Sequence, residues 1–154
     1  MIVQINPKDI SYLDAEKFCL KPYPNHRRGC PNYGKKSGCP TNIPALEEIL
    51  DFTQNVYLIY TEFPIGEHAE KMKKLHSGWT TRQVYCVLYW QPKARKMQRL
   101  EEEKCKKEKD INLILTSPEA MGFNITSLMN KIGVKLEWPP RKITRLVSLG
   151  GMKK

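Results

Sequence analysis

The sequence predicts an α/β fold, in which a small and mostly parallel sheet is covered by helices and preceded by an irregular cysteine-rich loop. From residue 44 onward, three strand-like apolar runs alternate with helical segments, an order typical of parallel crossover units. Residues 20–44, in contrast, are dense in Pro, Gly, Asn and basic residues and fit no regular element. The 154 residues, of which 40% are hydrophobic, can form one domain with its own core.

We therefore expect a single domain over residues 1–154, with 1–43 as the cysteine loop region and 44–154 as the α/β core. A helix is expected directly behind Pro44, where apolar residues recur at helical spacing. The run 55–63 (NVYLIYTEF) is rich in β-branched and aromatic residues, which predicts a buried strand. A polar helix should follow over 66–77.

The next segments predict two more helices and two more strands. Thr80 or Thr81 can cap a helix that includes the apolar run 84–90, and a charged helix over 93–109 follows Pro92. A second strand is expected over 111–116 (INLILT) and a third over 143–149. Between them, Ser117-Pro118-Glu119 has the cap, first-turn proline and early acid of a helix start, and Gly122 either lies within that helix or interrupts it.

Ligands of parallel sheets bind at the carboxyl ends of the strands. In the predicted sheet those ends are the segments 63–66, 116–119 and 150–151. We place the cysteine loop over this rim, with Ser117 and Glu119 as candidate acid/base residues beside it.

Cys19, Cys30 and Cys39 lie in the irregular loop and account for three of the five cysteines. Their spacing is wider than the close cysteine pair of a zinc finger or ribbon, and the odd total argues against a disulfide framework. Cys30 and Cys39 each follow glycine and precede proline, and proline after a cluster ligand occurs in ferredoxin-type runs. The loop therefore predicts a metal or iron–sulfur site, against the alternative of three unligated surface thiols.

Further motifs accompany the three cysteines: Pro24-Asn25-His26, Gly29-Cys30-Pro31-Asn32-Tyr33-Gly34, Cys39-Pro40, Leu88-Tyr89-Trp90, Ala94-Arg95-Lys96 and Pro118-Glu119-Ala120-Met121-Gly122. Together they resemble an uncharacterised family of predicted metal-binding proteins. The resemblance implies a metal or iron–sulfur site built by Cys19, Cys30 and Cys39, and it supplies no reaction. In one departure, Thr41 follows Pro40 where similar proteins have a second proline.

The other possible ligands leave a three-cysteine site with one open position. Cys86 lies in an apolar run and is expected in the core, whereas Cys105 is expected on the solvent face of a charged helix. His26 lies within the loop and can either ligate or hydrogen-bond to a sulfur. An open position is what a catalytic metal needs.

The favoured hypothesis is an iron–sulfur ([4Fe–4S]) protein with an open iron, acting in sulfur removal or transfer on a small anionic or nucleobase-like ligand. The alternative is a non-enzymatic nucleic-acid-binding module whose basic loop is folded by a structural metal such as zinc. A third possibility is a protein–protein adaptor with a structural metal, so whether the chain is an enzyme stays open. The net charge of +10, concentrated in 19–42, 93–109 and 131–154, favours an anionic partner.

Several other classes of function lack support in the sequence. No apolar run is long enough to cross a membrane, and Met1-Ile2-Val3-Gln4 does not begin a secretory signal, so we expect a cytoplasmic protein without a membrane partner. Walker, Gly-x-Gly-x-x-Gly and Gly-x-Ser-x-Gly motifs are absent from the sequence. Glu101, Glu102 and Glu103 are expected on a solvated helix face. His68 and His76 share a helix face with no matching acid or cysteine, which makes a metal site there improbable.

Overall fold

The computed structural model of the chain describes residues 1–22 and 26–154 and contains one antiparallel sheet. Its four strands lie in the order β1-β2-β4-β3. They are β1 (Ile2–Ile5), β2 (Val56–Phe63), β3 (Leu113–Leu115) and β4 (Thr144–Gly151). Every neighbouring pair is antiparallel, so the predicted mostly parallel sheet is wrong. β2 and β3 do run in the same direction, but β4 lies between them and makes each pairing antiparallel.

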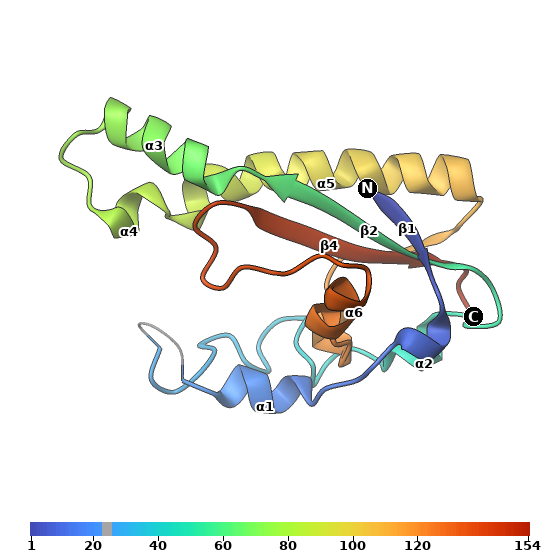
Figure 1. Cartoon of the computed structure of the whole chain (residues 1–154). Coiled ribbons are helices and arrows are strands. Elements are labelled where there is room, and N and C mark those ends of the chain that lie inside the picture. The colour runs from blue at the N-terminus through green and yellow to red at the C-terminus, as the bar shows by residue number, and fades with distance from the viewer. Residues whose placement is uncertain (23–25) are drawn as a thin grey trace.

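Helices cover both faces of this sheet (Figure 1). One face is covered by α5 (Val87–Lys109), and the opposite face by α2 (Leu46–Ile49) and α6 (Ile125–Lys131). The helix α1 (Ala15–Leu20) lies below α6, farther from the sheet. Beyond the end of β2, α3 (Ile65–Leu75) and α4 (Thr81–Val84) project to one side. Two 3-10 turns, η1 (Pro7–Asp9) and η2 (Pro118–Met121), complete the regular structure among the described residues.

Most of the elements predicted from residue patterns are present. The strands expected over 55–63, 111–116 and 143–149 correspond to β2, β3 and β4, and the helix over 66–77 corresponds to α3. The helix expected after Pro44 is the single turn α2. Gly122 ends η2 in the left-handed conformation, and the helix restarts as α6 behind Asn124, whose side chain accepts a hydrogen bond from Ser127 N–H.

The apolar run 84–90 is helical, but it is divided differently from the prediction. Thr80 caps α4 through a reciprocal pair of hydrogen bonds with Gln83, and the chain breaks at Tyr85 and Cys86 before α5 begins. α5 then continues through Pro92. Pro92 has no N–H to donate to the carbonyl oxygen one turn earlier. That carbonyl belongs to the first turn of α5, so a single hydrogen bond near the helix start is lost and the helix continues.

Alternate side chains of β2 face the two helical layers. Leu58 and Tyr60 contact the larger apolar cluster, which includes Phe123, Leu128 and Met129 beneath the sheet. Tyr57 and Ile59 instead pack against Cys105 of α5. Cys105 is fully buried, so its predicted solvent-facing position is wrong, and burial raises the pKa of its thiol.

The N-terminal region contributes an edge strand as well as the cysteine loop. β1 pairs with β2 from Ile2 opposite Ile59 to Ile5 opposite Val56. The amino group of Met1 donates hydrogen bonds to the carbonyl oxygen of Tyr60 and to the carboxylate of Glu101. The sheet is therefore assembled from both ends of the chain.

The rim predicted from parallel strand ends does not exist in this arrangement. The carboxyl ends of β2 and β3 lie at one edge, but Gly150 and Gly151 end β4 at the opposite edge, beside the start of β3. The cysteine loop lies below α6, away from the sheet (Figure 1). No helix among the described residues is long and apolar enough to cross a membrane.

Candidate metal centre and adjoining cavity

The first two cysteines of the loop are held together through the backbone. Asp14 caps α1 by accepting a hydrogen bond from Lys17 N–H, and α1 carries Cys19 into the loop. The N–H of Cys30 donates to the carbonyl oxygen of Cys19 at 2.7 Å. Gly29 makes this approach possible, because its φ is +80° and an added Cβ would lie 2.4 Å from the same oxygen.

The third cysteine, Cys39, lies in a turn that is held by hydrogen bonds between polar groups of the loop. The thiol of Cys39 is buried and donates to the carbonyl oxygen of Asn32 at 3.1 Å. The side-chain amide of Asn42 donates to the carbonyl oxygens of Gly34 and Lys36 at 3.2 and 2.9 Å. These bonds give the segment a defined shape with little apolar core of its own.

The thiol of Cys19 lies close enough to the other two cysteines to be affected by their charges. Partial burial raises the pKa of Cys19, and the charges of Cys30, Cys39 and Glu16 raise it further. The five basic side chains of the loop are all exposed: Lys21, Arg27, Arg28, Lys35 and Lys36. The loop thus combines a thiol whose ionisation its neighbours disfavour with a cationic surface.

The described residues contain no group of three or more His, Cys, Asp or Glu side chains that is arranged to hold a metal ion. Cys19, Cys30 and Cys39 belong to one loop, so the donor set suits a thiolate-ligated site, and its metal stays a prediction. His26 is half-buried, and its carbonyl oxygen accepts a hydrogen bond from Gly29 N–H. The Pro24-Asn25 part of the motif lies outside the described residues, as does Tyr23.

The remaining metal-ligand candidates are placed elsewhere in the fold. Cys86 is half-buried at the junction of α4 and α5. Cys105 belongs to α5 and packs against Tyr57 and Ile59 of β2, on the face of the sheet that α5 covers. On α3, His68 contacts the ring of Phe63, whereas His76 stacks on Trp79, so the two histidines have different aromatic partners.

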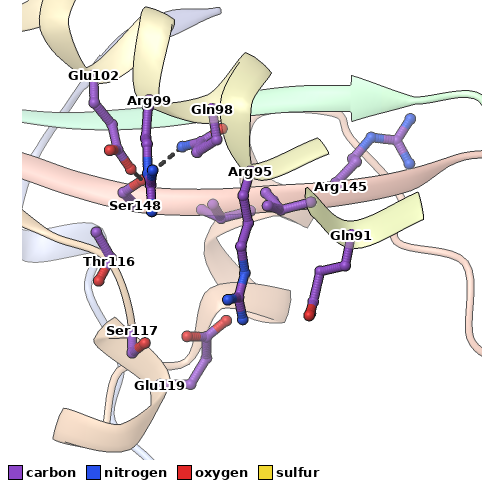
Figure 2. A pocket seen from close by; sticks show the side chains of 12 residues that line it. Gln91, Arg95, Gln98, Arg99, Glu102, Thr116, Ser117, Glu119, Arg145 and Ser148 are labelled. Atoms are coloured by element: carbon purple, nitrogen blue, oxygen red, sulfur yellow. Dashed lines mark hydrogen bonds between the residues drawn. The ribbon is translucent and has the colours of Figure 1, made fainter. Parts of the chain in front are cut away.

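A cavity of about 460 Å³ lies where α5, β4 and the segment after β3 meet. Ser117 and Glu119, the predicted acid/base candidates, both line it (Figure 2). The prediction that they lie on a rim of parallel strand ends is wrong, because the sheet is antiparallel. They converge on a cavity because the chain turns into η2 after the three residues of β3.

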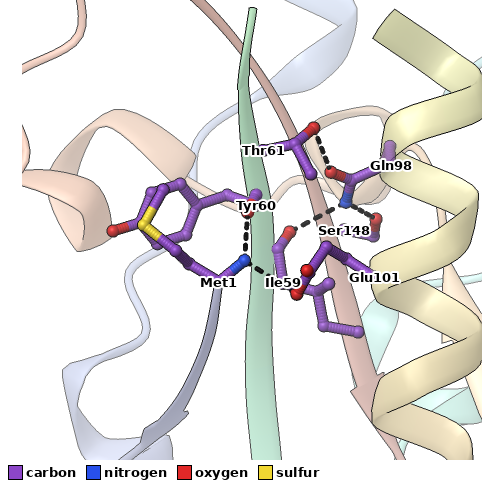
Figure 3. A network of polar contacts seen from close by, with 7 residues as sticks. All are labelled: Met1, Ile59, Tyr60, Thr61, Gln98, Glu101 and Ser148. Atoms are coloured by element: carbon purple, nitrogen blue, oxygen red, sulfur yellow. Dashed lines mark hydrogen bonds and ion pairs between the residues drawn. The ribbon is translucent and has the colours of Figure 1, made fainter.

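Buried polar side chains of α5 form the wall of this cavity against the sheet (Figure 2), and Figure 3 shows the hydrogen bonds of one of them, Gln98. Gln98 donates to the carbonyl oxygen of Ile59 and the hydroxyl of Ser148, and it accepts from the hydroxyl of Thr61. Ser148 in turn donates to the carboxylate of Glu102. Glu102 is therefore buried, and its predicted solvated position is wrong.

Sequence reasoning missed Gln98, Glu102 and Ser148 as site residues. A pattern in the sequence could have identified Gln98 and Glu102. They continue the four-residue spacing of Trp90 and Ala94, which marks the side of α5 that faces the sheet. Ser148 carries no comparable signal, because a strand serine can face either layer.

The cavity is connected to the cysteine loop through η2. Leu13 N–H donates to the carbonyl oxygen of Gly122 at 2.8 Å, and Asn124 N–H donates to that of Ser11 at 2.9 Å. These bonds fix the segment that leads into α1 against the turn that carries Glu119. The base of the cysteine loop and one wall of the cavity thus form a single structural unit.

Glu119 is accessible to water within the cavity, but the surrounding protein desolvates its carboxyl group and raises the pKa. The folded state then binds the proton more tightly than the unfolded chain, so ionisation of Glu119 opposes folding as pH rises above the ordinary glutamate value. We expect Glu119→Gln to raise the Tm at about pH 7, and this gain should vanish below about pH 4, where both states are protonated.

Thermal denaturation at several pH values, with Glu103→Gln as the exposed control on α5, measures this effect. A Tm gain for Glu119→Gln that is the same at all pH values would contradict the assigned cause.

Comparisons of this chain with models of protein families, with curated proteins and with solved structures find no match. The resemblance of the cysteine loop to predicted metal-binding proteins therefore rests on the residues of the motifs alone.

Proposed function

We propose that this chain is a metal-binding protein in which Cys19, Cys30 and Cys39 ligate a [4Fe–4S] cluster and leave one iron open. The observation that carries the proposal is the folded loop itself, in which Cys30 N–H donates to the carbonyl oxygen of Cys19 at 2.7 Å and the charges of Cys30 and Cys39 reach the thiol of Cys19. Thiolates that repel one another gain stability when they share a positively charged centre. When bound, such a cluster would offer its open iron as a coordination site for a substrate.

The loop's own residues favour this function in two further ways. Its exposed cations offset the negative charge that three thiolates bring to a cluster. Its backbone is ordered by hydrogen bonds with few buried side chains, so ligand bonds would add directly to its stability. Gly29 keeps the first two cysteines adjacent, and any larger residue there would collide with the backbone of Cys19 and Leu20.

Anaerobic reconstitution with ferrous iron and sulfide tests the proposal. We expect broad visible absorption from sulfide-to-iron charge transfer that develops with the amount of iron added. The same protein titrated with zinc alone serves as the comparison for a single-ion site. A chain that stays colourless with iron and sulfide but binds zinc stoichiometrically would contradict the proposal and favour a structural zinc.

For the reaction, we propose sulfur removal or transfer on a small anionic or nucleobase-like ligand. Glu119 supports an acid/base role in it, because a carboxyl group with a raised pKa retains its proton closer to neutral pH. Ser117 lies on the same wall of the cavity and can donate a hydrogen bond to a bound group.

The alternative is a nucleic-acid-binding module folded by a structural metal, and the five exposed cations of the loop favour it. Binding to RNA or DNA would then fall steeply with salt, and neutralising Arg27, Arg28, Lys35 and Lys36 together would flatten that dependence. Neutralising Lys104, Lys106 and Lys107 serves as the control, because acidic residues lie within a turn of them. If the unmodified chain binds no nucleic acid at low salt, the small-molecule function remains.

A further inference from the structure

A second cavity of about 350 Å³ adjoins the first, and Glu119, Arg145 and Val147 line both. Its other walls are mainly apolar and include Phe123 and Leu136. The two cavities therefore meet at Glu119 and pass along the edge of β4, and together we call them the β4-edge cavity. One half is polar and the other half is apolar.

The fold creates this opening because β3 is short. β3 pairs with β4 only from Leu149 to Gly151. The part of β4 from Arg145 to Ser148 pairs with β2 on one side and borders the cavity on the other. The position where a longer β3 would continue is left open for a ligand.

The basic side chains of the polar half differ in how they are engaged. Arg145 is paired with Glu62, with its Nη2 2.6 Å from a carboxylate oxygen, and it also donates to the carbonyl oxygen of Lys135. Arg95 and Arg99 lie one turn apart on α5, and neither forms an ion pair or hydrogen bond within the part of the chain that the structure describes. Figure 2 shows Arg95 extending from α5 toward Glu119.

Guanidinium groups one turn apart can hold one anionic group between them, because each presents several donors in a planar fork. The hydroxyl groups of Thr116 and Ser117 line the same half and provide neutral donors. Glu119 is the acid nearest to this region on η2, and desolvation disfavours its charged form. The carboxylate of Glu102 also lines this half, but it accepts a hydrogen bond from Ser148 and lies buried against the sheet. An anion in the polar half therefore meets two arginines without an ion pair among the described residues, and Glu102 and Glu119 are the acids that line the same half.

We propose that the β4-edge cavity binds a small amphipathic anion, with a carboxylate or phosphate head at Arg95 and Arg99 and an apolar body in the half lined by Phe123 and Leu136. Small-molecule sites commonly combine mostly apolar walls with a few convergent polar groups. The arginines and the apolar walls that carry this proposal lie outside residues 20–44. The cavity shares Ser117 and Glu119 with the proposed reaction, but anion binding at Arg95 and Arg99 can be measured without a cluster.

Isothermal titration calorimetry of the full chain tests this site with octyl phosphate below its micelle concentration. Inorganic phosphate supplies the head alone, 1-octanol supplies the body alone, and octanoate separates a carboxylate from a phosphate head. We expect octyl phosphate or octanoate to bind at one site and more tightly than either fragment. Equal binding of 1-octanol would overturn the proposal, as would no saturable binding of either amphipathic anion.

Matched variants locate the head group. Arg95→Gln with Arg99→Gln should weaken binding of the amphipathic anion about tenfold or more, because charge-assisted hydrogen bonds are lost. Lys104→Gln with Lys106→Gln removes the same charge from exposed positions on the same helix and should leave the affinity within about twofold. An equal loss in the two double variants would show an effect of net charge and overturn the assigned site.

Leu136→Asn tests the apolar half separately. It should weaken the amphipathic anion several-fold and leave the weak binding of inorganic phosphate unchanged, because Leu136 is assigned to the body alone. Unchanged affinity for the amphipathic anion in folded Leu136→Asn protein would contradict the assignment of the apolar half. Circular dichroism and Tm establish that each variant is folded.

Discussion

Cys30→Ala is expected to abolish loading of iron and sulfide, and Cys19→Ala and Cys39→Ala should do the same. Each substitution removes one of the three thiols of the loop, in which the backbones of Cys19 and Cys30 are hydrogen-bonded to each other. A cluster left with two protein ligands has lost a covalent attachment that no neighbouring thiol in the loop can replace. Iron and sulfide analysis after anaerobic reconstitution measures the loss.

Cys86→Ala and Cys105→Ala are the matched controls, since both thiols lie outside the loop. Both variants should retain the full amount of cluster. Stoichiometric metal in Cys30→Ala protein would contradict the three-cysteine assignment. Loss of metal in folded Cys86→Ala protein would instead mean that the site has a fourth cysteine ligand.

Phe123→Ala is expected to cost about 3–5 kcal/mol of the free energy of unfolding, as for other large buried aromatic side chains. Phe123 is fully buried in the larger apolar cluster between the sheet and α6. Its backbone also pairs with Tyr12, which joins the N-terminal segment to the turn after η2. The substitution therefore removes packing at the point where the sheet, η2 and the base of the cysteine loop meet.

Urea denaturation followed by circular dichroism measures this change. Leu88→Ala is the control, because the Leu88 side chain is 76% exposed and should contribute about 0.5 kcal/mol or less. A loss below about 1 kcal/mol for Phe123→Ala would contradict the assignment of this cluster as the main core.

The residue patterns predicted the elements of this fold better than their arrangement. The strand 55–63 and the helix 66–77 were identified because periodicity and turn residues act within a few neighbouring positions. Strand adjacency depends on pairing between distant segments, so the chain order alone could not show that β4 lies between β2 and β3. β1 was missed because its four residues are too few to show a clear alternation.

Some residues of the candidate site were predicted from the sequence, but the arguments for several of them were wrong. Gly29 entered the prediction as the glycine before Cys30, and in the structure it allows the close approach of the Cys19 backbone. Ser117 and Glu119 were selected from a supposed strand rim, yet they line a cavity. Glu102 was assigned to the solvent because lysines lie at pairing distance along the same helix, but its helix position and Ser148 place it against the sheet.

The iron, sulfide and zinc content of the chain purified under anaerobic conditions tests the central claim most directly. The three-cysteine cluster predicts about four iron and four sulfide per chain. It also predicts that the chain carries no stoichiometric zinc. Stoichiometric zinc without sulfide would contradict the cluster, and it would mean that the loop of Cys19, Cys30 and Cys39 holds a structural ion.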